Sequence, residues 1–210
     1  MQFSSLSSRI AAALLAALTL QVSAADNPAR HQNITLDAAS SEVDYKKNTV
    51  EFKDIVISQG DIKVEAHHAE AEATGLNFKT GVWTFSGDVR IHVEKRGNLR
   101  SDQAVLDFKD SQIVKATITG KPAQFEQQRE ASDQIARGHA GQIVYEPTEG
   151  VVRLSNDAWL SDGRNEIRGP LLVYNIRQQH VEAVAQPGNE DRVHITIDPN
   201  QDERKPKRCV

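Results

Sequence analysis

The sequence predicts an all-β protein whose antiparallel strands stack in repeating units. From Ile34 to Ile197, apolar and polar residues alternate with a period of two, and Gly, Asn and Asp separate the alternating runs. This is the pattern of antiparallel strands that bury one face. A short motif also recurs at intervals typical of supersecondary units that share one continuous core.

The recurring motif is an apolar residue, a turn with Gly or Asn beside Asp or Lys, and a further alternating run. Its copies are Phe85-Ser86-Gly87-Asp88-Val89, Ile118-Thr119-Gly120-Lys121-Pro122 and Leu154-Ser155-Asn156-Asp157-Ala158, with a looser copy at Phe52-Lys53-Asp54-Ile55. A second element lies between the copies and aligns on Ala69, Ala104, Ile143 and Leu172, at intervals of 35, 39 and 29 residues. We therefore expect the repeats to stack on one another.

The chain divides into three parts. Residues 1–25 have a weakly positive start, an apolar run from Ile10 to Leu20 and small residues before Ala24 and Ala25, which predicts a signal peptide cleaved near these alanines. Residues 26–198 form the predicted β-domain. Residues 199–210 are polar and are expected to be a disordered tail. The mature protein is therefore expected to be exported and soluble.

The elements follow in order along the domain. Hairpin turns are predicted at residues 58–61, 96–98, 109–111, 147–150 and 162–165, where Gly, Asn, Asp and Pro interrupt the alternation. The segment from His67 to Ala73 suits a helix or a strand, and the repeat favours a strand. Glu126 to Gln134 is expected to be a long hairpin loop, and Val193 to Ile197 a last strand.

Composition and motifs argue against several classes of function. A formal net charge of −4 and a pI near 6.0 disfavour nucleic acid as a partner. The histidines have no metal-ligand spacing, and the single cysteine, Cys209, lies in the predicted tail. No nucleophile elbow, phosphate loop or dinucleotide fingerprint occurs. We therefore expect neither an enzyme nor a bound metal or cofactor.

The motifs resemble the OstA-like family of lipopolysaccharide-transport proteins over roughly residues 33–197. The resemblance rests on Phe85 to Val89, on Ile57 to Gly60 followed by Ile62 to Ala66, on Gly120 to Phe125, and on Gly138 to Ala140 leading to Val144-Tyr145. It implies an open, slightly twisted antiparallel β-jellyroll of about sixteen short strands with a V-shaped interior. It also implies a periplasmic bridge that carries lipopolysaccharide, with an inner-membrane partner LptC, an outer-membrane partner LptD and head-to-tail self-association.

Alternation and repeat register give a set of residues expected to line an apolar interior that binds acyl chains. These are Phe85, Val89, Ile91, Ala104, Leu106, Phe108, Ile118, Phe125, Ile143, Tyr145, Leu154, Leu160, Leu172 and Tyr174. The same residues could instead fill a closed core. Two other functions also stay open, namely an exported polysaccharide-binding or polysaccharide-cleaving β-solenoid, and an assembly module without cargo.

Overall fold

The computed structural model describes residues 35–73, 80–95, 97–110, 112–128, 135–175, 178, 180–185 and 192–199. The predicted signal peptide and residues 200–210 of the predicted tail, with Cys209, lie outside these residues. Within this described part, twelve strands form one sheet. They are β1 (Thr35–Asp37), β2 (Ser40–Asp44), β3 (Thr49–Gln59), β4 (Ile62–Ala73), β5 (Gly81–Val93), β6 (Gly97–Lys109), β7 (Gln112–Gln128), β8 (Ile135–Glu146), β9 (Val151–Ser161), β10 (Glu166–Asn175), β11 (His180–Val184) and β12 (His194–Thr196).

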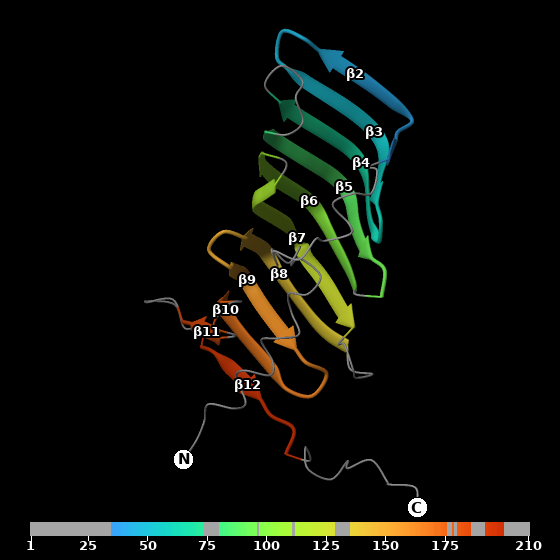
Figure 1. The fold of residues 1–210 in the computed structure, drawn as a ribbon. Helices are drawn as coiled ribbons and strands as arrows, with labels where there is room; N and C mark the ends of the chain where they lie inside the picture. The colour runs from blue at the N-terminus through green and yellow to red at the C-terminus, as the bar shows by residue number, and fades with distance from the viewer. Residues whose placement is uncertain are drawn as a thin grey trace, which may run out of the picture.

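Every strand pairs antiparallel, and from β3 to β10 each strand pairs with the next one along the chain. The strands stack from β2 at one end to β12 at the other, and their direction turns steadily along the stack (Figure 1). Each end layer consists of two short strands on one long neighbour. β1 and β2 pair with β3, while β11 and β12 pair with β10.

The described residues form twelve strands where about sixteen short ones were expected, because the central strands are long. Their lengths run from 10 residues in β10 to 17 in β7. The sequence predicts a turn at the recurring motif. It lies instead inside the strands, where it shifts the register and lets the strand continue.

The motif forms β-bulges. Gly87 and Asp88 have φ values of 78° and 50°, and Asn156 and Asp157 have 65° and 59°. The left-handed region is open to Gly and, with modest strain, to Asn and Asp, which explains the residue types of the motif. Each strand pair from β4–β5 to β9–β10 has a register shift beside the motif, and these shifts form one row across the sheet. We call this row the bulge line. Bulges bend and twist a strand.

Several sequence expectations are confirmed. The segment from His67 to Ala73 belongs to strand β4. The corresponding connections between strands fall within the turns predicted at 58–61, 109–111, 147–150 and 162–165. The predicted last strand contains β12. The long loop expected at 126–134 begins later than predicted, because β7 continues to Gln128. Residues 129–134 lie outside the described part.

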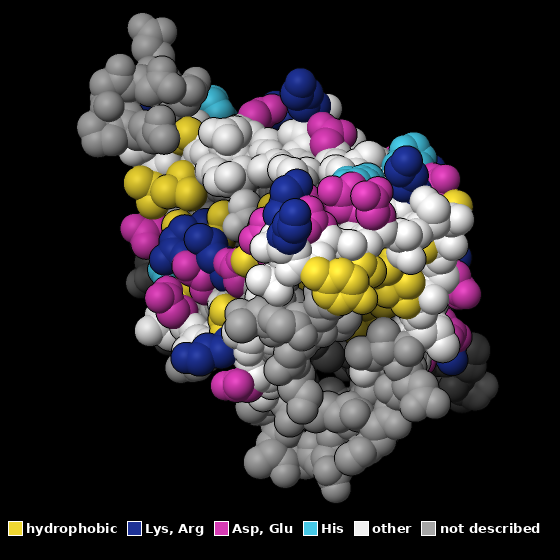
Figure 2. Space-filling view, turned by 90° about the horizontal axis from the view of Figure 1, so that it is seen from above, with side chains coloured by type: hydrophobic (Ala, Val, Ile, Leu, Met, Phe, Trp, Pro, Cys, Tyr) yellow, Lys and Arg dark blue, Asp and Glu magenta, His cyan; other side chains and the backbone are white. Residues whose placement is uncertain are grey.

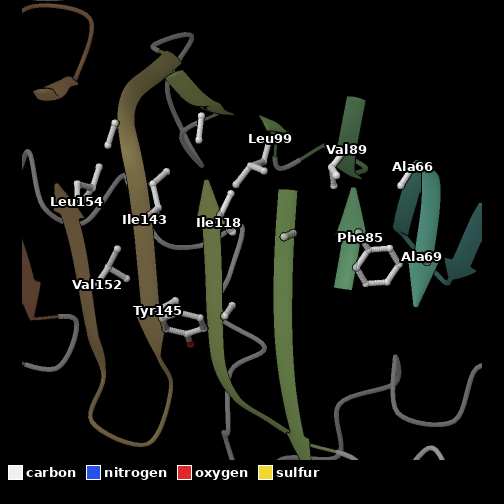
Figure 3. Close-up of a cluster of buried hydrophobic side chains, with 14 of the residues drawn as sticks. Ala66, Ala69, Phe85, Val89, Leu99, Ile118, Ile143, Tyr145, Val152 and Leu154 are labelled. Carbon is white, nitrogen blue, oxygen red and sulfur yellow. The ribbon is translucent and has the colours of Figure 1, made fainter. Parts of the chain in front are cut away.

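The sequence repeat corresponds to one row of side chains. The apolar residues of both repeated elements are direct cross-strand neighbours beside the bulge line, and none is more than 8% exposed. We call these residues the corner row and the face that carries them the inner face (Figure 3). The corner row consists of Phe52, Ala69, Phe85, Ala104, Ile118, Ile143, Leu154 and Leu172.

Candidate functional site

Two further rows of apolar side chains run along the inner face, one on each side of the corner row. The first, the tyrosine row, consists of Val43, Val50, Ala71, Trp83, Leu106, Ala116, Tyr145, Val152, Tyr174 and Val181. The second, the isoleucine row, lies beyond the bulge line and consists of Leu36, Ile57, Val64, Ile91, Leu99, Phe125, Gly138, Leu160, Ile167 and Ile195.

Each row runs across the strands from one end layer to the other. Directly opposed Cβ atoms on neighbouring antiparallel strands lie about 5 Å apart, so side chains within a row are in mutual reach. The only position without a side chain is Gly138. There an added Cβ would lie 2.3 Å from Phe125 Cζ and 2.7 Å from Leu160 Cδ2. These two neighbours occupy the space above the glycine, and the apolar surface is continuous.

Every member of the corner row is buried, whereas the two flanking rows contain both buried and partly exposed members. Ile118 and Leu154 in the corner row are fully buried, whereas Leu106 in the tyrosine row and Phe125 in the isoleucine row are only partly buried. The rows end in exposed side chains. Leu36 is 40% exposed, Val43 is 41% exposed and Ile195 is 60% exposed. The inner face therefore has a closed corner, more accessible flanks and uncovered ends.

The predicted lining residues fall on one face of the sheet. Val89 lies between the corner and isoleucine rows, and Phe108 lies two residues beyond Leu106 on the same side of β6. The remaining members belong to the three rows. The buried members are Phe85, Val89, Ala104, Ile118, Ile143, Tyr145, Leu154, Leu160, Leu172 and Tyr174, and the partly exposed members are Ile91, Leu106, Phe108 and Phe125.

Sequence reasoning did not include several residues of this face. Phe52, Trp83 and Leu99 belong to the rows, but the set expected from alternation and repeat register does not contain them. Alternation within each strand predicts the faces of Phe52 and Trp83. Trp83 lies two residues before the selected Phe85, and Phe52 is the apolar residue of the loosest motif copy. Leu99 directly follows the predicted turn at 96–98, which made its orientation ambiguous.

Aromatic side chains lie in both halves of the inner face. Trp83 stacks between Phe52 and Phe85, with ring centroids 6.0 Å and 5.9 Å apart and interplanar angles of 5° and 18°. Farther along, burial raises the pKa of the Tyr145 hydroxyl and that of Tyr174, because an apolar surrounding disfavours the charged phenolate. Both phenols stay neutral at physiological pH, and the face carries no charge at these positions.

The outer face is polar. Arg137 Nε donates to Glu126 Oε1 at 2.9 Å, and Trp159 Nε1 donates to Glu166 Oε2 at 3.3 Å. A hydrogen bond from Arg90 lowers the pKa of the Asp88 carboxyl. A hollow of about 240 Å³ at the bulge line is lined by Asp54, Ile55, Val56, Glu65, Ala66, His67, Asp88 and Arg90. Its charged lining does not suit an acyl chain.

The described residues contain no group of three or more His, Cys, Asp or Glu side chains placed to hold a metal ion. In the same part of the chain, we find no helix of the length and apolarity that would cross a membrane. The corner, tyrosine and isoleucine rows of the inner face consist of aliphatic and aromatic side chains and one glycine. Such a surface binds apolar ligands without a preferred direction.

The chain is similar to known proteins. The chain is 29% identical over 136 residues to the lipopolysaccharide export system protein LptA of Escherichia coli K12, covering 64% of this chain and 71% of that protein. It is 26% identical over 145 residues to the lipopolysaccharide export system protein LptH of Pseudomonas aeruginosa, covering 67% and 80%. A crystal structure of LptH aligns with a TM-score of 0.46 at 23% identity, covering 82% of this chain and all of that one.

The model of one protein family matches residues 68–180, from the middle of β4 to the first residue of β11. This match covers more than half of the chain and confirms the resemblance that the repeat motifs indicated. The protein therefore belongs to the LptA/(LptD N-terminal domain) family of lipopolysaccharide transport proteins.

Proposed function

We propose that this protein carries lipopolysaccharide between membranes by holding its acyl chains against the inner face. The observation that carries the proposal is the set of apolar rows that run without interruption from one end layer to the other. An acyl chain laid along these rows meets carbon at every strand. The family membership and the curated relatives, which are lipopolysaccharide export proteins, support this function over a polysaccharide-acting solenoid.

The energetics favour such a carrier. Exposing one CH2 group to water costs about 0.8 kcal/mol, so a twelve-carbon chain costs about 10 kcal/mol. Contact with a continuous apolar row removes much of this cost at every position along the stack. Because apolar contact has no preferred direction, neighbouring positions have similar energy. The lipid can therefore slide from strand to strand without a deep trap.

The accessible flanks of the inner face provide the contact surface. Corner residues such as Ile118 are covered by protein, whereas Leu106, Phe108, Ile91 and Phe125 keep part of their surface open. These four residues therefore make the first contacts with an acyl chain. The buried members of the predicted set support them from behind by packing and hold the two flanks apart. The proposal thus assigns different roles to the two groups of lining residues.

The end layers suit head-to-tail assembly. Within the described residues, β1 and β2 have a strand neighbour on one side only, as do β11 and β12. Unpaired edges accept a strand from another chain, and a contact between two different edges extends into a filament. Viewed from the β2 end, hydrophobic side chains reach the surface between charged ones (Figure 2). LptC would dock at the β1–β2 edge and LptD at the β11–β12 edge.

The compartment follows from the same role. A carrier between two membranes works in the periplasm, which agrees with the signal peptide predicted in residues 1–25. The related LptH is described as a periplasmic component of the lipopolysaccharide transport device. Cleavage near Ala24 or Ala25 would release the mature chain, with residues 26–198 as its working domain. Transport of this kind requires no catalytic group in the protein itself.

Photo-cross-linking at neighbouring positions of β6 tests the function. Leu106 lies on the inner face and Val105 on the outer face, and both are partly exposed. With p-benzoylphenylalanine at position 106, we expect irradiation to capture lipopolysaccharide in cells. The same group at position 105 should capture little. Equal capture at both positions, or none at position 106, would reject the inner face as the carrier surface.

Light scattering tests the assembly. Val43 and Ile195 are exposed apolar residues at opposite ends of the stack. We expect Val43→Asp and Ile195→Asp each to lower the average mass at high protein concentration, because each charge blocks one kind of edge. A mixture of the two variants should form dimers through the two intact edges. Unchanged mass in both variants would contradict head-to-tail stacking.

A further inference from the structure

The strands at the two ends of the stack run in opposite directions. Seven antiparallel pairings separate β3 from β10, and an odd number of reversals leaves these two strands antiparallel. β1 and β2 run against β3, while β11 and β12 run against β10. When a second copy continues the stack of Figure 1, its β1 and β2 therefore run antiparallel to β11 and β12. The antiparallel sheet continues across such a joint.

The apolar rows have a fixed spacing where they reach the β11–β12 edge. In β10, Ile167 of the isoleucine row lies seven residues before Tyr174 of the tyrosine row. Their neighbours at the edge are Ile195 on β12 and Val181 on β11. A segment that joins this edge and continues both rows must therefore have two apolar residues that are also seven positions apart.

The β1–β2 edge has the same spacing. Leu36 of the isoleucine row lies seven residues before Val43 of the tyrosine row, and both strands pair with β3 in one continuous register. One placement of a second copy therefore sets Val43 opposite Val181 and Leu36 opposite Ile195 at the same time. A shift by one residue would turn every side chain to the wrong face, and a shift by two would move both rows out of line.

The same placement brings opposite charges together on the outer face. Two exposed histidines, His180 on β11 and His194 on β12, each precede an inward-facing row residue and therefore point outward. At the other end, Asp37 and Asp44 each follow an inward-facing row residue and also point outward. In the matched register, His180 lies opposite Asp44 and His194 lies opposite Asp37. Opposite charges that face each other across antiparallel strands stabilise the pairing.

We propose that copies of this protein join in this one register, and that protonation of His180 and His194 opposite Asp44 and Asp37 tightens the joint. This inference rests on the proposed head-to-tail assembly and adds its register and its pH dependence. Histidine is the side chain whose charge ordinarily changes between about pH 5 and pH 8. Two opposite-charge pairs make association about 2 to 30 times tighter when both histidines are charged.

The charged groups around His194 complement an acidic partner. Arg168 lies directly opposite His194 on β10, Glu166 lies diagonally opposite, and Arg192 is two residues away along the chain. Asp37 faces an uncharged valine on its own side of the joint, in β3. The carboxylate therefore meets a mainly positive group. Proton binding by His194 adds a positive charge directly opposite it.

The surroundings of His180 are more acidic. It faces an uncharged asparagine on β10, and Glu182 lies two residues away on the same side of β11. Asp44 pairs with Lys47 at 3.6 Å and faces a threonine on β3. At the joint, Glu182 lies opposite Glu42, which already faces a glutamate on β3, and these like charges oppose association. A protonated His180 beside these carboxylates offsets part of their repulsion.

Sedimentation of the full protein at about pH 8 and about pH 5.5 tests the pH dependence. We expect the wild type to associate about 2 to 30 times more tightly at the lower pH. The net charge also falls toward zero near the pI of about 6.0, which promotes unspecific association. His180→Gln/His194→Gln keeps that general effect without a histidine at the joint, so most of the tightening should disappear. His92→Gln, at an exposed position in the middle of the stack, should behave as the wild type.

Disulfide cross-linking tests the register. Ser41 and Ala183 lie opposite each other in the proposed joint. In a Cys209→Ser background, Ser41→Cys/Ala183→Cys should form chains of linked copies on mild oxidation. Ser41→Cys/Val181→Cys is offset by two residues, which places the Cβ atoms about 7–8 Å apart and beyond the reach of a disulfide. This second pair should form few links.

The outcomes separate this inference from the proposed assembly. Association that does not change with pH, tightening that persists in the double histidine variant, or equal linking of both cysteine pairs would overturn the inference and leave the assembly standing. A wild type that stays monomeric at both pH values, together with no linking of either cysteine pair, would reject the head-to-tail assembly as well.

Discussion

The middle of the stack and its two end layers carry the same apolar rows but differ in burial. Ile118 in β7 is fully buried, whereas Ile195 at the end of the isoleucine row is 60% exposed. Both are isoleucines on the inner face of an antiparallel pair. The difference arises because β7 has long strand neighbours on both sides, while β12 pairs only with β10 among the described residues.

This comparison separates two uses of one sequence pattern. In the middle, the alternation stabilises the fold, because each apolar side chain is covered by others. At the ends, the same alternation leaves Leu36, Val43 and Ile195 uncovered, and these residues add little to the stability of a single chain. They are suited to contact with another chain or with the lipid. The predictions below test this division, starting with the largest expected effect.

The largest effect is expected from truncating a buried corner residue. Ile118→Ala should lower the free energy of unfolding by about 2–5 kcal/mol, because it leaves a cavity in the packed corner. Ile195→Ala should change it by less than about 0.5 kcal/mol. Urea unfolding followed by circular dichroism measures both. Similar losses in the two variants would mean that the end layers are as tightly integrated as the middle.

A smaller effect is expected at Gly138, in the middle of the stack, where Phe125 and Leu160 lie over the glycine. The Cβ of alanine would lie 2.3 Å from Phe125 Cζ, so Gly138→Ala should cost about 1–3 kcal/mol through overpacking. Phe125→Leu removes the ring and should recover part of this cost in the double variant. A double-mutant cycle in urea measures the coupling. Strictly additive costs would show that the ring does not oppose the added methyl group.

The tyrosine row should make the middle of the stack sensitive to alkali. Burial raises the folded-state pKa of Tyr145 and Tyr174 above the ordinary value of 10.0. The stabilisation that the two neutral phenols give the folded state is therefore complete below about pH 10. It is lost as the pH rises through the folded-state pKa. Unfolding measured from about pH 8 to pH 11 should show a steeper loss in the wild type than in Tyr145→Phe/Tyr174→Phe. Identical slopes would exclude a role for the two phenols.

The smallest effect is expected in the end layer at Asp44, the last residue of β2, whose side chain bonds to the turn that leads into β3. Its Oδ1 accepts the backbone N–H groups of Lys46 at 2.9 Å and Lys47 at 3.1 Å. These bonds, led by that of Lys47, lower its pKa from 3.8. The stabilisation from the ionised carboxylate is present above pH 3.8 and is lost as the pH falls through the lower folded-state pKa.

Asp44→Asn keeps the acceptor oxygen but loses the charge. This variant should therefore be slightly less stable than the wild type at pH 7, and the two should converge in acid. Thermal unfolding of both proteins at pH 7 and at a pH below 3.8 measures the difference in stability between them. A gap that stays constant with pH would mean that the carboxylate charge does not stabilise this turn.

The face of each central strand could be predicted from sequence, but the role of the motif could not. Alternation placed Phe85, Leu106 and Ile143 correctly on one face, because side chains alternate in any extended strand. Gly87-Asp88 and Asn156-Asp157 look like hairpin turns, because the left-handed residues that make a turn also make a bulge. Only the pairing of the neighbouring strands decides between a turn and a bulge. Because turns were expected at these positions, the predicted number of strands, about sixteen, exceeds the twelve in the described residues.

The sequence alone determined the all-β class, the inward set of apolar residues and the repeat, because these depend on local periodicity and residue type. Tertiary structure decided which of those residues are covered, that the repeat positions form a single row, and that the two end layers run in opposite directions. The reason is that coverage and pairing depend on segments distant in sequence. Alternation shows which face a side chain is on, and only the assembled sheet shows what lies opposite it.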